Sequence, residues 1–136
     1  MQADYDGDGL TDPSIYQETS GNWLMALSGH NYQSTNVQFG QSGYVPVPGE
    51  YGSLGYAQIA VYHEASGNWY IRTGPGPGEY TTVNFGQPGY VPMPADYAGD
   101  RYDDEAVFYR DRDDAIWYLL ESTEGPTMFS GRIGRP

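Results

Sequence analysis

The chain is 136 residues long, which is enough for one domain with its own hydrophobic core. Acidic residues number 18 against six arginines, and the resulting net charge of −12 disfavours binding to nucleic acid or to anionic lipid. The absence of cysteine excludes disulfides, and no apolar run is long enough to span a bilayer. The 19 glycines, 14 tyrosines and 10 prolines favour β-structure with many turns over helix.

Three similar segments follow one another along the chain. They cover residues 3–48, 49–94 and 95–136. A shift of 46 residues places Trp23 on Trp69, and Trp117 takes the matching place in the third segment. Recurrence at a fixed period of this length is the sequence signature of repeat architectures. The sequence therefore predicts a single repeat domain over residues 1–136.

The pattern of each repeat predicts four short strands. The first is a Val-Pro segment that leads into an acidic loop. The second, third and fourth strands are expected at residues 13–17, 23–27 and 36–39 in the first repeat, at 58–63, 69–73 and 82–85 in the second, and at 105–109, 117–120 and about 127–129 in the third. Ser-Gly-Asn joins the second and third strands of the first two repeats, which is typical of a hairpin turn. The predicted fold class is therefore all-β.

The first repeat opens with the acidic loop DYDGDGLTD, residues 4–12. Its clustered carboxylates repel one another unless a cation lies among them, and the glycines between them permit the positive φ angles of a tight loop. Hard oxygen ligands without imidazole or thiolate nearby suit Ca²⁺. The expected ligands are the side chains of Asp4, Asp6, Asp8 and Asp12 and the backbone carbonyl of Leu10.

The corresponding loops of the other two repeats are less complete. The second loop has these residues at the acidic positions: Glu50, Gly52, Leu54 and Gln58. We expect no tight calcium binding there. The third loop keeps these candidate ligands: Asp96, Asp100, Asp104 and the carbonyl of Tyr102. Because Ala98 stands at its second acidic position, we expect either weak binding or a water molecule in the place of that ligand.

The combination of DYDGDGLTD, the hairpins IYQETSGNW and VYHEASGNW, and the segments FGQSGYVPVPGEY and FGQPGYVPMPADY resembles FG-GAP/VCBS repeats. These are the calcium-binding blades of integrin α-subunit propellers and of many bacterial extracellular proteins. An EF-hand spaces its acids similarly but ends with Glu at position 12, where this loop has Ile15. The resemblance implies three four-stranded propeller blades, structural calcium, and a location outside the cell or at the cell surface.

Three blades do not complete a propeller, which typically closes with four to eight. The first repeat lacks a Val-Pro strand before Ala3, and residues 132–136 are expected to be a matching spare strand. Two copies would then form a six-bladed ring, so we expect a homo-oligomer, with a dimer favoured. Two alternatives stay open, namely a half excised from a longer propeller and a three-fold β-trefoil fold.

The residues favour a non-enzymatic module for ligand or glycan binding or for adhesion. His30 and His63 lie at non-equivalent positions and are expected at the surface, and neither a cysteine nor a G-x-S-x-G motif supports nucleophilic catalysis. The tryptophans are expected to pack between blades. The expected ligand-contacting aromatics are Tyr32, Tyr44, Tyr80 and Tyr90. Alternatives are an accessory domain of a polysaccharide hydrolase or lyase that uses the acids at 103–105, and a purely structural assembly fragment.

Overall fold

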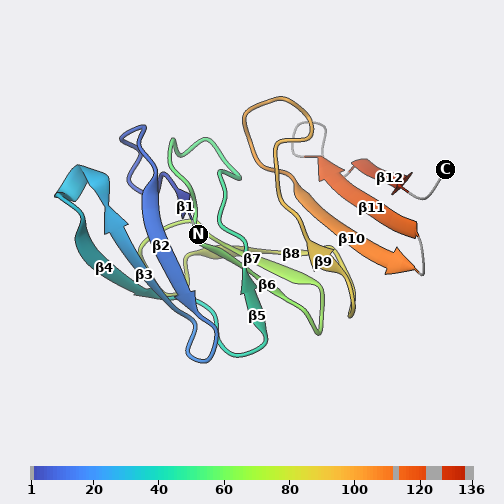
Figure 1. Cartoon of the computed structure of the whole chain (residues 1–136), viewed down its shortest axis with the longest axis horizontal. Coiled ribbons are helices and arrows are strands. Elements are labelled where there is room, and N and C mark those ends of the chain that lie inside the picture. Colours follow the sequence, from blue (N-terminus) through green and yellow to red (C-terminus); the bar gives the residue numbers. More distant parts are fainter. Residues whose placement is uncertain (1, 112–113, 122–126, 134–136) are drawn as a thin grey trace.

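The structure is a computed structural model, and it describes residues 2–111, 114–121 and 127–133. Three four-stranded antiparallel sheets lie side by side in chain order (Figure 1). Sheet 1 consists of β1 (Gln2–Ala3), β2 (Asp12–Gln17), β3 (Asn22–Leu27) and β4 (Gln33–Gln38). Sheet 2 consists of β5 (Tyr44–Pro46), β6 (Ala60–His63), β7 (Asn68–Arg72) and β8 (Tyr80–Asn84). Sheet 3 consists of β9 (Val91–Pro92), β10 (Glu105–Asp111), β11 (Asp114–Glu121) and β12 (Thr127–Ile133).

The prediction of an all-β chain with three four-stranded repeats is confirmed. The first repeat differs in one respect, because β1 pairs with β2 where no first strand was expected. Strand order follows chain order within each sheet, because every strand pairs with the one before it. The short Val-Pro strands β5 and β9 precede the second and third loops, as the sequence predicts. A 3-10 helix, η1 (Ser28–His30), connects β3 to β4 in the first repeat and was not predicted.

The fourth strand of the third repeat differs from the prediction. Instead of ending near residue 129, β12 runs to Ile133 and pairs with β11 along its whole length. Arg132 lies opposite Ile116, so the first part of the proposed spare strand at 132–136 belongs to sheet 3. Residues 134–136 lie outside the described part of the chain. The register explains the difference, because Trp117 faces Gly131 in the way that Trp23 faces Val37.

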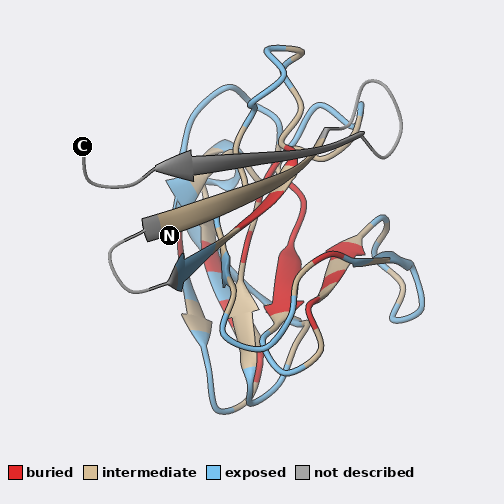
Figure 2. Ribbon diagram, turned by 90° about the vertical axis from the view of Figure 1, so that its right-hand side faces the viewer, coloured by how far each residue is buried: buried red, intermediate tan, exposed pale blue. Residues whose placement is uncertain are grey.

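A buried tryptophan lies in each of the first two sheets. Trp23 and Trp69 are fully buried, and each indole N–H donates a 2.8 Å hydrogen bond to a backbone carbonyl, that of Phe39 or of Phe85. Figure 2 shows the buried residues along the strands in the interior, with exposed loops around them. The prediction that the tryptophans pack between repeats is confirmed for these two.

Two apolar clusters join the three sheets. Between sheets 1 and 2, Trp23 and Met25 pack with Ile59 and Val61. Between sheets 2 and 3, the corresponding cluster includes Trp69, Ile71 and Val107, together with Val47, Ala60, Tyr62 and Phe85. Burial of this apolar area is the main favourable term that holds one sheet against the next.

The hairpin turn of the first repeat packs against the Phe-Gly segment that follows β4. Gly21 has a φ of +75°, and a Cβ placed there would lie 2.1 Å from the carbonyl oxygen of Gly40. The Phe39 N–H donates to the Gly21 carbonyl over 3.0 Å in the same contact. This close approach of two backbones explains why the Ser-Gly-Asn and Phe-Gly motifs recur together.

Gly21→Ala is expected to lower the free energy of unfolding by about 2–4 kcal/mol, because a strained φ and a backbone clash add together. Urea unfolding at neutral pH measures the loss. Gly43→Ala is the matched control, since Gly43 has a φ of +89° with nothing within 4 Å of the added Cβ. Equal losses in the two variants would show that the Gly21–Gly40 approach is unimportant.

Candidate metal site and inter-sheet cavities

The loops at residues 4–11, 50–57 and 96–103 are closed in the same way, and all three project from the same side of the molecule, at the top of Figure 1. An antiparallel residue pair closes each loop: Ala3 with Asp12, Gly49 with Gln58, and Ala95 with Asp104. The loop geometry therefore does not depend on whether the closing residue is charged.

Asp4 organises the first loop from within. Its carboxylate accepts backbone N–H groups from Gly7 at 2.7 Å, Asp8 at 3.2 Å and Gly9 at 2.9 Å. The loop wraps around this side chain because Gly7 and Gly9 adopt φ angles of +77° and +87°, which glycine adopts without strain.

The wrapping brings three carboxylates together. Oxygen atoms of Asp4, Asp6 and Asp8 all lie within 4.8 Å of one another. Asp8 is exposed, while Asp4 and Asp6 are partly buried, so the cluster is accessible from solvent. Each oxygen can accept a hydrogen bond and still offer a lone pair to a cation, and an all-carboxylate set suits a hard ion such as Ca²⁺. The residues of this loop thus fit the predicted metal.

Donors from η1 cover one side of the cluster. The Gly29 N–H donates to Asp6 over 2.9 Å, and the Ser28 hydroxyl donates to Asp8 over 2.8 Å. His30 lies 3.8 Å from Asp6 with its Nδ1 and is largely exposed, as predicted for this residue. These neighbours were not identified from the sequence, because they follow the loop by about twenty residues and carry no motif.

Asp12 is separate from the three clustered acids. It is fully buried, and its two oxygens accept the N–H groups of Tyr5 and Ser28, both over 2.7 Å. Burial alone raises the pKa of Asp12, but these backbone donors outweigh burial and lower the pKa. The Leu10 N–H donates to Asp8 over 2.8 Å, and a role of its carbonyl as a ligand stays a prediction.

Asp12→Asn is expected to cost about 1.5–3 kcal/mol of stability at neutral pH, because one of two hydrogen bonds to a charged acceptor is lost. A carboxyl with a lowered pKa stabilises the fold above its ordinary value of 3.8, and this contribution disappears as the pH falls below 3.8. Urea unfolding in chelator should therefore show the wild type and the variant converging as the pH falls. A constant difference at all pH values would contradict this role of the carboxylate.

The third loop repeats this hydrogen-bond network around Asp96. Its carboxylate accepts N–H groups from Gly99 at 2.6 Å, Asp100 at 3.1 Å and Arg101 at 2.9 Å. These bonds, with that from Arg101 first, lower the pKa of Asp96. Arg101 replaces Gly9 and keeps a φ of +79°. The Tyr102 N–H donates to Asp100 over 2.9 Å, as Leu10 does to Asp8.

Loops two and three keep the scaffold without the triad of acids. Asp104 accepts the Tyr97 N–H over 2.9 Å, and the neutral Gln58 accepts the Tyr51 N–H over 3.1 Å in the same way. Ala98 supplies no side-chain oxygen at the position of Asp6. Among the described residues, only the first loop gathers three possible ligands.

The acids at 103–105 have three different environments. The Asp103 carboxylate accepts the Glu50 N–H over 2.8 Å, and burial raises the pKa of Asp103. Asp104 is fully buried at the base of its loop. Glu105 lines a cavity of about 330 Å³ between sheets 2 and 3, and burial raises the pKa of Glu105 as well. Two of the three acids thus serve the backbone, which does not favour a catalytic pair.

Glu105→Gln is expected to stabilise the protein at neutral pH by up to about 1 kcal/mol, because the charge of a partly buried carboxylate is removed. A raised folded-state pKa means that stability falls as the pH rises from about the ordinary value of 4.5. The advantage of the variant should therefore grow with pH, measured by thermal unfolding in chelator. Glu18→Gln, at an exposed hairpin position, is the control that should show no such trend.

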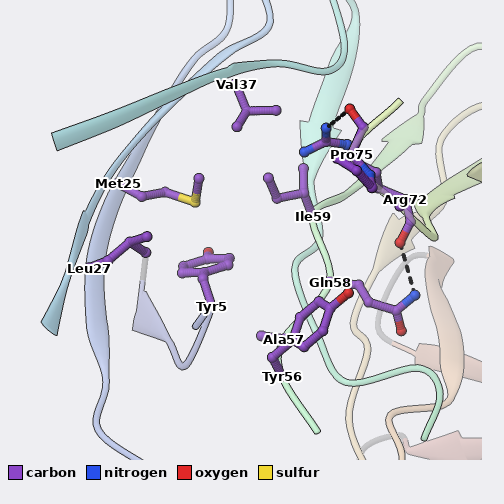
Figure 3. Close-up of a pocket in the computed structure, with 11 residues that line it drawn as sticks. Tyr5, Met25, Leu27, Val37, Tyr56, Ala57, Gln58, Ile59, Arg72 and Pro75 are labelled. Carbon is purple, nitrogen blue, oxygen red and sulfur yellow. Dashed lines mark hydrogen bonds between the residues drawn. The ribbon is translucent and has the colours of Figure 1, made fainter. Parts of the chain in front are cut away.

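An equivalent cavity of about 220 Å³ lies between sheets 1 and 2 (Figure 3). Met25 and Val37 form one wall, and Ile59 and Arg72 form the other. Ile59 occupies the place that Glu105 takes in the next interface, because each follows the closing residue of its loop. The Arg72 guanidinium donates to the Pro75 carbonyl over 2.6 Å and is held at the cavity wall. Both cavities are thus mainly apolar spaces between repeats.

The four candidate tyrosines divide into two kinds. Tyr32 and Tyr80 are exposed. Tyr44 stacks on His63 at 4.5 Å, and Tyr90 stacks on Tyr118 at 5.7 Å, so these two serve packing between strands. His63 is partly exposed, and its Nδ1 lies 2.7 Å from the Ser66 hydroxyl.

No helix in the described part of the chain is long and apolar enough to cross a membrane. Comparisons with protein-family models, with curated proteins and with solved structures give no match. The resemblance to FG-GAP/VCBS repeats therefore stays a prediction from the sequence motifs.

Proposed function

We propose that this protein is a non-enzymatic, calcium-binding repeat module whose first loop holds the ion. The observation that carries the proposal is the convergence of Asp4, Asp6 and Asp8, whose oxygens lie within 4.8 Å of one another. The role of calcium is structural. The ion neutralises three carboxylates that otherwise repel one another, and it stabilises the folded state because the unfolded loop does not gather them.

Calcium titration by calorimetry is expected to give one site per chain. Saturation at 100 times Kd adds about 2.7 kcal/mol, which raises the melting temperature on the order of 10 °C for a chain of this size. Asp6→Ala should abolish both effects, because it gives loop one the side chain that loop three has at Ala98. An unchanged melt in calcium and in chelator would overturn the proposal.

The reverse substitution tests whether the third loop lacks only one ligand. Ala98→Asp completes the triad with Asp96 and Asp100, whose hydrogen-bond network already matches that of loop one. The expected result is a second calcium site per chain. Leu54→Asp is the matched control, because it adds the same charge to loop two, where Gly52 leaves the set incomplete. Equal calcium uptake by the two variants would indicate nonspecific attraction to acidic loops.

The sheets are proposed to be blades of a propeller-type assembly. Three separate sheets stacked through a repeated tryptophan contact support blades more than a β-trefoil, and we propose an extracellular or cell-surface location. A solvent-accessible triad suits the weak class of calcium sites in extracellular modules, with Kd values of about 10⁻⁴–10⁻³ M.

The ligand of such a module is proposed to be a glycan or another cell-surface ligand. Tyr80 is exposed and lies 6.1 Å from Phe39, which lines a cavity of about 310 Å³ with Asn36 and Arg72. An exposed aromatic ring beside amide and guanidinium groups can stack on a sugar and hydrogen-bond its hydroxyls. Glycan-array binding that Tyr80→Ala abolishes would support this role, and silence of the array would favour an assembly fragment without a ligand.

A hydrolase or lyase accessory role is less well supported. It requires acids that face a cleft, and of the residues at 103–105 Glu105 lines a cavity, whereas Asp103 and Asp104 accept backbone N–H groups. Turnover of a polysaccharide that Glu105→Gln removes would nevertheless establish it.

A further inference from the structure

The chain uses one kind of sheet-to-sheet contact twice. The Ala57 N–H donates to the Asp4 carbonyl over 2.7 Å between repeats 1 and 2. The Asp103 N–H donates to the Glu50 carbonyl over 2.7 Å between repeats 2 and 3. Donor and acceptor both move by 46 residues, so the two interfaces have the same register.

The apolar part of the contact repeats in the same way. The tryptophan face of one sheet, with Trp23 or Trp69, covers a valine of the next sheet, Val61 or Val107. Both valines are only 1% exposed. We name the side of a sheet that carries this valine position its valine face.

The valine face of sheet 1 is uncovered. Ile15 occupies the position of Val61, yet it is 64% exposed, and its neighbour Leu24 is exposed as well. Together with Pro13 and Ala26 they line a mainly apolar groove of about 370 Å³. Large exposed apolar side chains that share one groove mark an interaction surface rather than scattered surface residues.

The tryptophan face of sheet 3 is the complementary uncovered surface. Trp117 pairs with Phe108 in the way that Trp69 pairs with Tyr62, but it is only half-buried, whereas Trp23 and Trp69 are fully buried. Leu119, two residues further along the same face, is also half-buried. Sheet 1 and sheet 3 lie at opposite ends of the row, so neither can cover the other within this arrangement (Figure 1).

We infer that a second copy of this chain covers these surfaces, with the valine face of sheet 1 packed on the tryptophan face of sheet 3 from the other copy. One chain carries both halves of an interface that it already forms twice, and this is why we name a second copy as the occupant. By the register of the internal contacts, the Thr11 N–H meets the Asp96 carbonyl of the other chain. Two copies joined at both ends give six sheets, within the range that closes a ring.

This inference goes beyond the calcium proposal and does not depend on it. Each copy has a net charge of −12, so the two repel at long range, and salt weakens this repulsion. Association is therefore measured at about 0.5 M salt, where the Debye length is only about 4 Å, both in calcium and in chelator.

Light scattering is expected to give twice the 15.0 kDa mass of one chain. Ile15→Glu should weaken the dimer on the order of 100-fold or more, because it places an unpaired charge in both seams. Ile15 is exposed in the single chain, so the variant should keep its fold. Tyr32→Glu is the matched control, since it adds the same charge at a side chain that is 60% exposed and does not line the groove of sheet 1.

A mixing experiment tests which surfaces meet. Ile15→Glu and Leu119→Lys should each be monomeric alone, because every homodimeric seam is altered. An equimolar mixture should recover the dimer, since one seam then has the wild-type residues and the other an opposite-charge pair.

A mass of 15.0 kDa at every concentration and salt would overturn the inference and point to a different protein segment as the occupant. Equal weakening by Ile15→Glu and Tyr32→Glu, or failure of the mixture to dimerise when both variants are folded, would overturn it as well. Loss of the dimer in chelator alone would show that calcium supports assembly, while loss of calcium binding with an intact dimer would leave this inference standing.

Discussion

In the first two repeats, the buried indole joins the loop to the Phe-Gly segment that follows the last strand. In all three repeats a loop tyrosine packs edge-on against the tryptophan ring at nearly the same distance between ring centroids. The pairs are Tyr5–Trp23 at 6.4 Å, Tyr51–Trp69 at 6.5 Å and Tyr97–Trp117 at 6.4 Å. The backbone N–H of that same tyrosine donates to the residue that closes the loop. The core therefore helps to position each loop.

This coupling places three carboxylates of the first loop close together. Backbone donors and η1 hold them, so the cost of bringing like charges near one another is met by folding. A ligand that enters a preformed site avoids the entropy of ordering it. The third loop has the same backbone hydrogen bonds to Asp96 but lacks the third carboxylate. The hydrogen bonds that shape the loop are therefore independent of the number of acidic side chains in it.

Local signals made most of the fold predictable. Ser-Gly-Asn turns, alternating strands and the 46-residue period define hairpins whose partners are close in sequence, and these were placed within a few residues. The register of β12 was not predicted. Phe129 resembles the phenylalanine of the Phe-Gly segments, which suggested that the strand ends there, but Trp117 pairs with Gly131 and the strand continues to Ile133. In the candidate site, Asp4, Asp6 and Asp8 follow from spacing alone. The donors Ser28 and Gly29 could not be predicted in this way. They contact Asp6, Asp8 and Asp12 because the end of β3 lies beside the loop, although it is about twenty residues away in the sequence.

The closing position of the loops has a consequence for how such repeats change over time. Asp12 and Gln58 share one task, which is to accept a loop tyrosine N–H. They differ in the other contact, because Asp12 accepts the Ser28 N–H whereas the Gln58 amide donates to the Arg72 carbonyl. A repeat can therefore gain or lose charge at this position when the second backbone partner changes with it, from an N–H donor to a carbonyl acceptor. Substitutions in these loops can therefore change the ion or ligand preference of one repeat at a time, while the tyrosine–tryptophan contact beneath each loop stays the same.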